Sequence, residues 1–223
     1  MPECKDVLAA LTSLVATFAG AWAAFRFEGR RRTTEEERKN VGAGNRAIYG
    51  VYGLWNVLEQ YRKEALESFR GRPDAWLNLA AHPAPPSATD RFQTADLQFL
   101  LETGQASMFT ALMLEQQRFD LAMALIHNRS ELVLKSVFPR MAAAGFPVGK
   151  PQDLANVERV LGIDLCHQLQ QITQAIYQNV DEDLASLRKA HDDLRKALET
   201  IYPERKFIQI IFEDSAPHAA TPA

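Results

Sequence analysis

The chain is poor in cysteine and has little excess of charge of either sign, and these two shortages exclude whole classes of protein. Cys4 and Cys166 are its only cysteines in 223 residues, so a disulfide-stapled scaffold is excluded. Its 25 basic and 28 acidic residues leave a net charge of -3, which argues against a generally basic nucleic-acid-binding protein. Apolar residues make up 47% of the chain, which is enough for a sizeable core and too many for a disordered protein.

The sequence also lacks the short motifs that carry catalysis or hold a cofactor. It has no phosphate-binding or dinucleotide-binding glycine loop and no nucleophile elbow. Its histidines do not have the spacing of metal ligands, and the two Glu-x-x-His pairs of a di-iron bundle are missing. We therefore predict no catalytic residue, no cofactor, no metal ion, no nucleic acid and no small-molecule substrate. An enzyme whose site is assembled from scattered residues stays open as an alternative.

What the sequence does have is a run of uncharged, mostly apolar residues near its start, from residue 7 to residue 25. As an α-helix this run would be roughly 28 Å long, close to the roughly 30 Å hydrocarbon core of a bilayer. Trp22 and Phe25 stand at one end, where the aromatic belt of membrane proteins falls. The run therefore predicts a single transmembrane helix.

Basic residues are concentrated on one side of this run. Arg26, Arg30, Arg31 and Arg32 follow it, whereas Lys5 is the only basic residue before it. The positive-inside rule then places the short N-terminus outside and the bulk of the chain in the cytoplasm, at the inner membrane of a bacterium. We expect the four arginines to contact anionic lipid headgroups.

Three other interpretations of the run remain. A cleaved signal peptide needs a positively charged start and a shorter apolar stretch, and here two acidic residues accompany Lys5. A helix rich in alanine also suits a protein core. A helix lying on the membrane surface needs a polar face, of which the run has little.

Small residues recur along one side of the predicted membrane helix. Ala16, Gly20 and Ala24 are four positions apart, so they lie on one face. Faces of this kind let membrane helices approach closely. They predict self-association or packing against the membrane helix of a partner protein, although an alanine-rich run also produces such spacing by chance.

The rest of the sequence predicts helices. Residues 33–70 and 94–144 repeat apolar side chains every three or four positions. Gly104 is expected to split off a short first helix, and Pro139 to kink or end its helix. Whether residues 33–70 continue the membrane helix is left open by the sequence. Residues 165–201 come close to heptad spacing. The positions of this seam are Leu165, Leu169, Ile172, Ile176, Leu184, Leu187, His191, Leu194 and Leu198. An irregular step at 180–183 leaves open whether the stretch is one helix or a hairpin, and His191 is expected to be a partly buried polar residue that helps to set register.

The expected fold class is all-α. An N-terminal transmembrane helix precedes a cytosolic bundle of about four or five helices whose C-terminal part resembles a coiled coil. The predicted divisions are a membrane anchor with a basic collar at 1–32, a helical bundle at 33–212 and a disordered tail at 213–223. Prolines make 71–93 a loop, in which one turn docks Trp76. Residues 206–212 are β-branched and aromatic, so they must pack on the bundle or pair with another segment.

Several segments resemble bacterial single-pass membrane proteins with a helical cytosolic region. They are the start at 19–27 before the basic residues, the segment Leu97–Leu101 followed by Phe119 and by Asn128-Arg129-Ser130, and the ending at 202–208. The resemblance covers most of the chain with unspecific motifs. It implies a membrane-tethered helical protein and carries no functional residue with it.

Two functions follow as hypotheses. The first is a non-enzymatic membrane-anchored scaffold that forms homo-oligomers or docks a partner protein, with the seam and the small face of the anchor carrying the association. The second is an effector or sensor of a bacterial toxin or antiviral defence system, which perturbs the bilayer when its cytosolic part is triggered.

Overall fold

A computed structural model describes residues 4–82, 92–146 and 153–212; the side chains of residues 4–13 and of Val15 are outside this description. The described part is all helical and contains no strand, which confirms the all-α class. The predicted tail at 213–223 and part of the predicted loop at 71–93 lie outside the described residues. The helical elements are α1 (Cys4–Tyr61), η1 (Arg62–Leu66), η2 (Glu67–Phe69), α2 (Ala75–Asn78), η3 (Thr94–Leu97), α3 (Gln98–Glu102), α4 (Ala106–Leu132), η4 (Val133–Val137), α5 (Phe138–Ala143), α6 (Leu154–Leu161) and α7 (Ile163–Ile201).

The chain divides into two compact units, Met1–Ala43 and Gly44–Ala223. Helix α1 runs through both without a break, so the apolar run and the helix predicted from residue 33 are one element. The helix continues through the wide turn η1 and the tight turn η2 to Phe69, close to the predicted end at residue 70. In the first unit the structure is this single helix.

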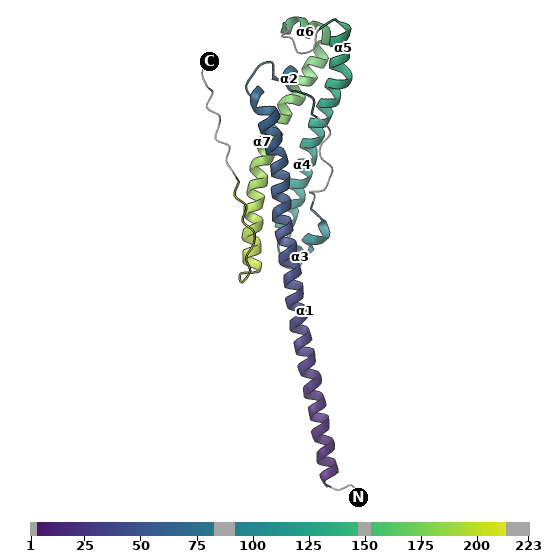
Figure 1. Ribbon diagram of the computed structural model, residues 1–223, viewed down its shortest axis with the longest axis vertical. Helices are drawn as coiled ribbons and strands as arrows, with labels where there is room; N and C mark the ends of the chain where they lie inside the picture. Colours follow the sequence, from purple (N-terminus) through teal and green to yellow (C-terminus); the bar gives the residue numbers. More distant parts are fainter. Residues whose placement is uncertain (1–3, 83–91, 147–152, 213–223) are drawn as a thin grey trace. The chain divides into compact units, whose positions relative to one another are not determined.

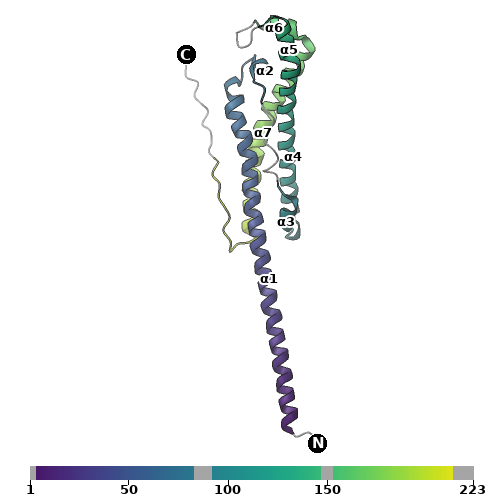
Figure 2. The ribbon, with the colours of Figure 1, turned by 45° about the vertical axis from the view of Figure 1, so that its right-hand side comes forward.

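The second unit is built around long helices that share one core. Helices α4 and α7 run antiparallel and side by side, as Figures 1 and 2 both show. The C-terminal part of α1 packs against α7, since Gly44 lies against the side chain of Leu198. A Cβ atom at Gly44 would lie 2.8 Å from one methyl carbon of Leu198, so a side chain at residue 44 would require the Leu198 side chain to move.

The core of the second unit comes from the periodic apolar positions. Fully buried examples from three helices are Ile48, Leu112 and Leu169. At one end of the unit a smaller cluster joins Trp76 of α2 to Val133, Val157 and neighbouring residues. The predicted docking of Trp76 by a single helical turn is confirmed, because this residue lies on α2 and is 4% exposed.

The two predicted interruptions, at Gly104 and at Pro139, differ in their outcome. The helix stops between α3 and α4 at Gly104, whose φ of +78° is strained for any residue with a side chain. Pro139, by contrast, does not end its helix. The wide turn η4 precedes it and α5 continues to Ala143, because a wide turn re-registers the hydrogen bonds where proline offers no N–H.

Helix α7 settles the question that the spacing at 180–183 left open. It is one helix of 39 residues, with Val180 and Asp183 both buried inside it. The irregular spacing of the apolar positions rotates the buried stripe slightly around the axis of α7. The stripe therefore packs against different residues along the length of the helix. A hairpin at this point is excluded by the continuous helix.

The C-terminal segment is extended and packs on the bundle. Phe207 and Phe212 are buried, while Ile211 between them is 79% exposed. The ring of Phe212 lies edge-on to Trp55 and to His191, with ring centroids 4.8 Å apart in each case. Packing on the bundle is thus the alternative that this segment adopts.

Candidate functional site

The N-terminal unit carries large apolar side chains that are exposed. Leu14, Phe18, Trp22 and Phe25 are between 62% and 80% exposed. At 3.6 residues per turn these four positions lie along one side of α1. In proteins generally, large exposed apolar patches are typical of surfaces that contact lipid or another protein.

The opposite side of the same helix carries the predicted small face. Ala16, Gly20 and Ala24 are exposed, and no atom of the described residues lies within 4 Å of the place where a Cβ of Gly20 would stand. One helix therefore presents a bulky apolar side and a smooth small-residue side, with room for a second helix against the smooth one.

The predicted headgroup arginines follow the stripe and are exposed. Arg26 lies over the ring of Trp22, with its guanidinium carbon 4.9 Å from the ring centroid. Arg31 pairs with Glu35 and Arg32 with Glu28, each at 2.9 Å. These exposed pairs are weak in water, so they leave the guanidinium groups available to phosphate oxygens.

The prediction of a transmembrane helix is not supported by the described residues. Within them, no helix combines the length and the apolar character that crossing a bilayer requires. Residues 7–13 and Val15 of the predicted span are outside the described side chains.

The predicted helix seam is occupied inside its own chain. Eight of its nine side chains are buried in the bundle, and Ile172 is half-buried. His191 is 1% exposed, its Nδ1 lies 3.1 Å from a carboxylate oxygen of Asp192, and its Nε2 has no hydrogen-bond partner among the described residues. The seam therefore packs in the core of its own chain, and the small face of α1 is the exposed one of the two predicted association surfaces.

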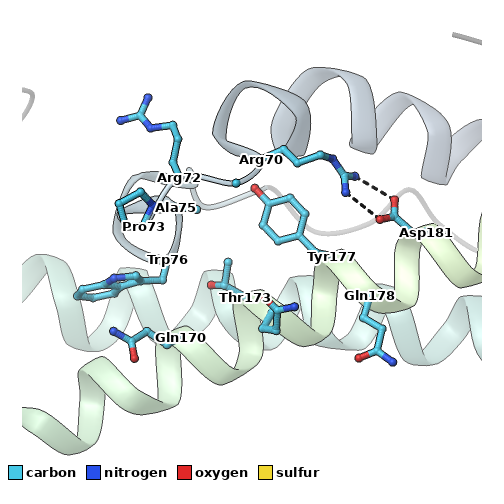
Figure 3. A pocket seen from close by; sticks show the side chains of 12 residues that line it. Arg70, Arg72, Pro73, Ala75, Trp76, Gln170, Thr173, Tyr177, Gln178 and Asp181 are labelled. Atoms are coloured by element: carbon cyan, nitrogen blue, oxygen red, sulfur yellow. Dashed lines mark hydrogen bonds and ion pairs between the residues drawn. The ribbon is translucent and has the colours of Figure 1, made fainter. Parts of the chain in front are cut away.

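The second unit holds a polar pocket of about 520 Å³ between α7 and the segment that leads into α2. Figure 3 shows α7 supplying one side, including Gln170, Thr173 and Tyr177, while Arg70 and Trp76 come from the opposing segment. Arg70 forms two hydrogen bonds to the carboxylate of Asp181, at 2.8 and 2.9 Å.

A buried arginine lies directly behind this pocket. Arg129 of α4 is 1% exposed. Its Nε donates to Oγ1 of Thr173 at 3.0 Å, and its Nη2 donates to the carbonyl oxygen of Trp76 at 2.9 Å. Burial lowers the pKa of Arg129, while nearby Tyr61 and Tyr177 act in the opposite direction. Burial in turn raises the pKa of Tyr61 to about 12.

A pair of buried carboxyl groups lies between α4 and α7. Glu115 accepts hydrogen bonds from Ser186 at 2.6 Å and from Arg118 at 2.9 Å. Asp183 is 6% exposed, and within the described part of the chain its Oδ2 has no hydrogen-bond partner. Burial, with Glu115 nearby, raises the pKa of Asp183 to about 6.

Sequence reasoning missed Arg129, Glu115 and Asp183 as buried polar residues. Asp183 does stand next to a seam position in an irregular step, and an acidic residue there is a usable signal. Arg129 offered none, because Asn128-Arg129-Ser130 looks like any polar stretch of a surface helix.

No known protein family, no curated protein and no solved structure matches this chain. Any functional conclusion therefore depends on the residues themselves.

Proposed function

We propose that the chain is a membrane-anchored helical protein that forms homo-oligomers or docks a partner at the inner face of a bacterial membrane. Residues 7–25 of α1 would enter the bilayer with the short N-terminus outside, and the second unit would remain in the cytoplasm. The observation that carries the proposal is the exposed stripe of Leu14, Phe18, Trp22 and Phe25. Fully burying one such side chain is worth about 1.5–3 kcal/mol, so a lipid environment would stabilise the stripe strongly.

The residues after the stripe fit the same arrangement. Trp22 combines an apolar ring with an N–H group, which suits the boundary between lipid and water. Arg26 lies over that ring, and further exposed arginines follow within two turns. Each basic residue near an anionic surface contributes about 1 kcal/mol.

Association is assigned to the small face because the seam is already occupied. Substituting Gly20 with Ile would place a bulky side chain on that face, whereas Ala21→Ile alters the other side of the helix. Crosslinking in native membranes should show less oligomer for Gly20→Ile than for Ala21→Ile. Monomer alone in the unsubstituted protein, with no co-purifying protein, would contradict this part of the proposal.

Anchoring and orientation are tested together by fractionation and protease protection. The full chain should pellet with membranes, resist extraction by salt and alkaline carbonate, and dissolve in detergent. Protease added outside spheroplasts should remove an N-terminal tag and spare a C-terminal one. Phe18→Arg should move the protein to the soluble fraction, while Glu36→Arg on the same helix should not. A wild-type chain in the soluble fraction, or a digested C-terminal tag, would overturn the proposal.

The unbroken course of α1 favours a second candidate function, a membrane-acting effector. A single helix from Cys4 to Tyr61 joins the apolar run to the bundle through continuous main-chain hydrogen bonds, so a change in the bundle could be transmitted along it. A membrane-potential dye should report depolarisation on induced expression. Unchanged potential and growth, with and without candidate triggers, would exclude this function.

A further inference from the structure

We propose that the pocket between α7 and the segment 70–76 binds a small molecule through an oxyanion, either a carboxylate or a phosphate. Its volume of about 520 Å³ lies in the range of small-molecule sites. The proposal is independent of membrane anchoring, since every residue that it uses belongs to the second unit.

The first feature that favours an anion is the positive charge of Arg129 beneath the pocket. Within the part of the chain that the structure describes, no carboxylate pairs with Arg129, whose acceptors are a hydroxyl and the carbonyl oxygens of Trp76 and Ala80. A buried cation of this kind is screened much less than an exposed one. The carboxylates around the mouth, on Asp181, Asp74 and Glu67, are one-third or more exposed and already pair with Arg70 and Arg72. The floor is therefore positive even though the nearby charges balance in number.

Thr173 links the buried guanidinium group of Arg129 to the interior of the pocket. Its side chain lines the pocket, as Figure 3 shows, and the residue is 3% exposed. Its Oγ1 accepts the hydrogen bond from Arg129. The described residues include no acceptor for the hydroxyl hydrogen of Thr173, so this polarised O–H is placed to donate to a ligand.

The walls supply the remaining donors. Gln170 and Gln174 stand one helical turn apart on α7 and line the pocket, and no hydrogen bond joins either side chain to another described residue. Arg72 also lines the pocket and is held by Asp74, in an exposed pair that contributes little. An oxyanion at Thr173 would accept from these amides, and the rotation of Arg72 away from Asp74 would add a guanidinium at the mouth.

The test is calorimetric titration of the full chain in mild detergent at constant ionic strength. Orthophosphate is the probe in one arm and citrate in the other, with chloride as the blank. At least one arm should show saturable binding of one anion per chain, with a Kd of about 1 mM or below. Binding in the orthophosphate arm would identify a phosphate ligand, and binding in the citrate arm would identify a carboxylate ligand. No saturable binding in either arm would overturn the proposal.

Three variants locate the site. Gln174→Ala removes one exposed amide and should weaken binding about tenfold, while Gln168→Ala, on the same helix outside the pocket, should not change it. Thr173→Val should abolish binding and Thr173→Ser should retain it, provided that both show a cooperative thermal transition. If Thr173→Val fails to fold, the comparison of Gln174→Ala with Gln168→Ala decides. Equal affinity in those two variants would place the anion elsewhere and refute the assignment.

Discussion

The two units of this chain use the same large apolar residues in opposite ways. In the first unit Phe18 is 75% exposed and Phe25 is 80% exposed. In the second unit Leu194 and Leu198 are fully buried, and exposed residues such as Leu121 are scattered. Both regions are helical with apolar residues three or four positions apart, so helical periodicity alone does not distinguish a core from an exposed stripe.

What distinguishes the units is the composition of the opposite face. In α7 the face away from the seam carries charged residues, which keeps it in water and drives the apolar side inwards. Around the stripe of α1 the opposite face is made of Ala16, Gly20 and Ala24. A helix that is apolar on all sides lacks a polar face for water, which is why the proposal assigns this part of α1 to lipid or to another protein.

The largest expected effect comes from truncating one apolar side chain in each unit. Leu194→Ala should lower the free energy of unfolding of the second unit by about 2–5 kcal/mol, because it leaves a cavity in a close-packed core. Phe18→Ala should change the same quantity by less than about 0.5 kcal/mol, because its side chain is exposed. Urea unfolding followed by tryptophan fluorescence measures both.

The same pair separates stability from membrane binding. Phe18→Ala should weaken partition into lipid vesicles, whereas Leu194→Ala should leave the partition of folded protein unchanged. If Phe18→Ala destabilised the second unit as much as Leu194→Ala does, the two units would not be distinct in the way described.

An intermediate effect is expected from adding a side chain at glycine. Gly44→Val should destabilise the second unit by about 1–3 kcal/mol, since its Cβ would meet Leu198 at 2.8 Å in a packed helix contact. Gly20→Val is the matched change in the first unit, where nothing in the described structure lies within 4 Å of the added Cβ. Thermal unfolding should show a lower Tm for Gly44→Val alone. A normal Tm for that variant would mean that the contact between α1 and α7 relaxes easily.

Much of the fold could be predicted from the sequence, because the periodicity of a helix and the effect of glycine or proline on the backbone are local properties. The end of the first helical stretch near residue 70, the stop at Gly104 and the docking of Trp76 all follow from residues close together in the chain. The continuity of α7 could not be predicted, because Asp181 is suited equally to capping the start of a new helix and to an exposed position within one long helix. Long-range packing against α4 decides between the two.

The candidate sites were harder to predict for the same reason. The apolar run and the arginines of α1 are contiguous in sequence, so their proximity could be predicted. The oxyanion pocket joins Arg129, Thr173 and Trp76 from three elements, and no spacing rule connects them. A polar residue becomes a site only when its burial is known, and burial is a tertiary property.

The smallest expected effect concerns ionisation. It compares a buried carboxyl group of the second unit, Asp183, with an exposed carboxyl group of the first unit. Burial and Glu115 raise the pKa of Asp183 from 3.8 to about 6. The folded state therefore binds more protons than the unfolded state between these values, so stability should fall as pH rises from about 4 to about 6. Asp183→Asn removes the buried charge and should raise stability by up to about 3 kcal/mol at pH 7.5, with little gain at pH 4. Urea unfolding across this pH range measures the difference, with the exposed Glu36→Gln in the first unit as the control, expected to follow wild type at every pH. A gain for Asp183→Asn that did not vary with pH would show that its source is packing or hydrogen bonding rather than the ionisation of a buried carboxyl group.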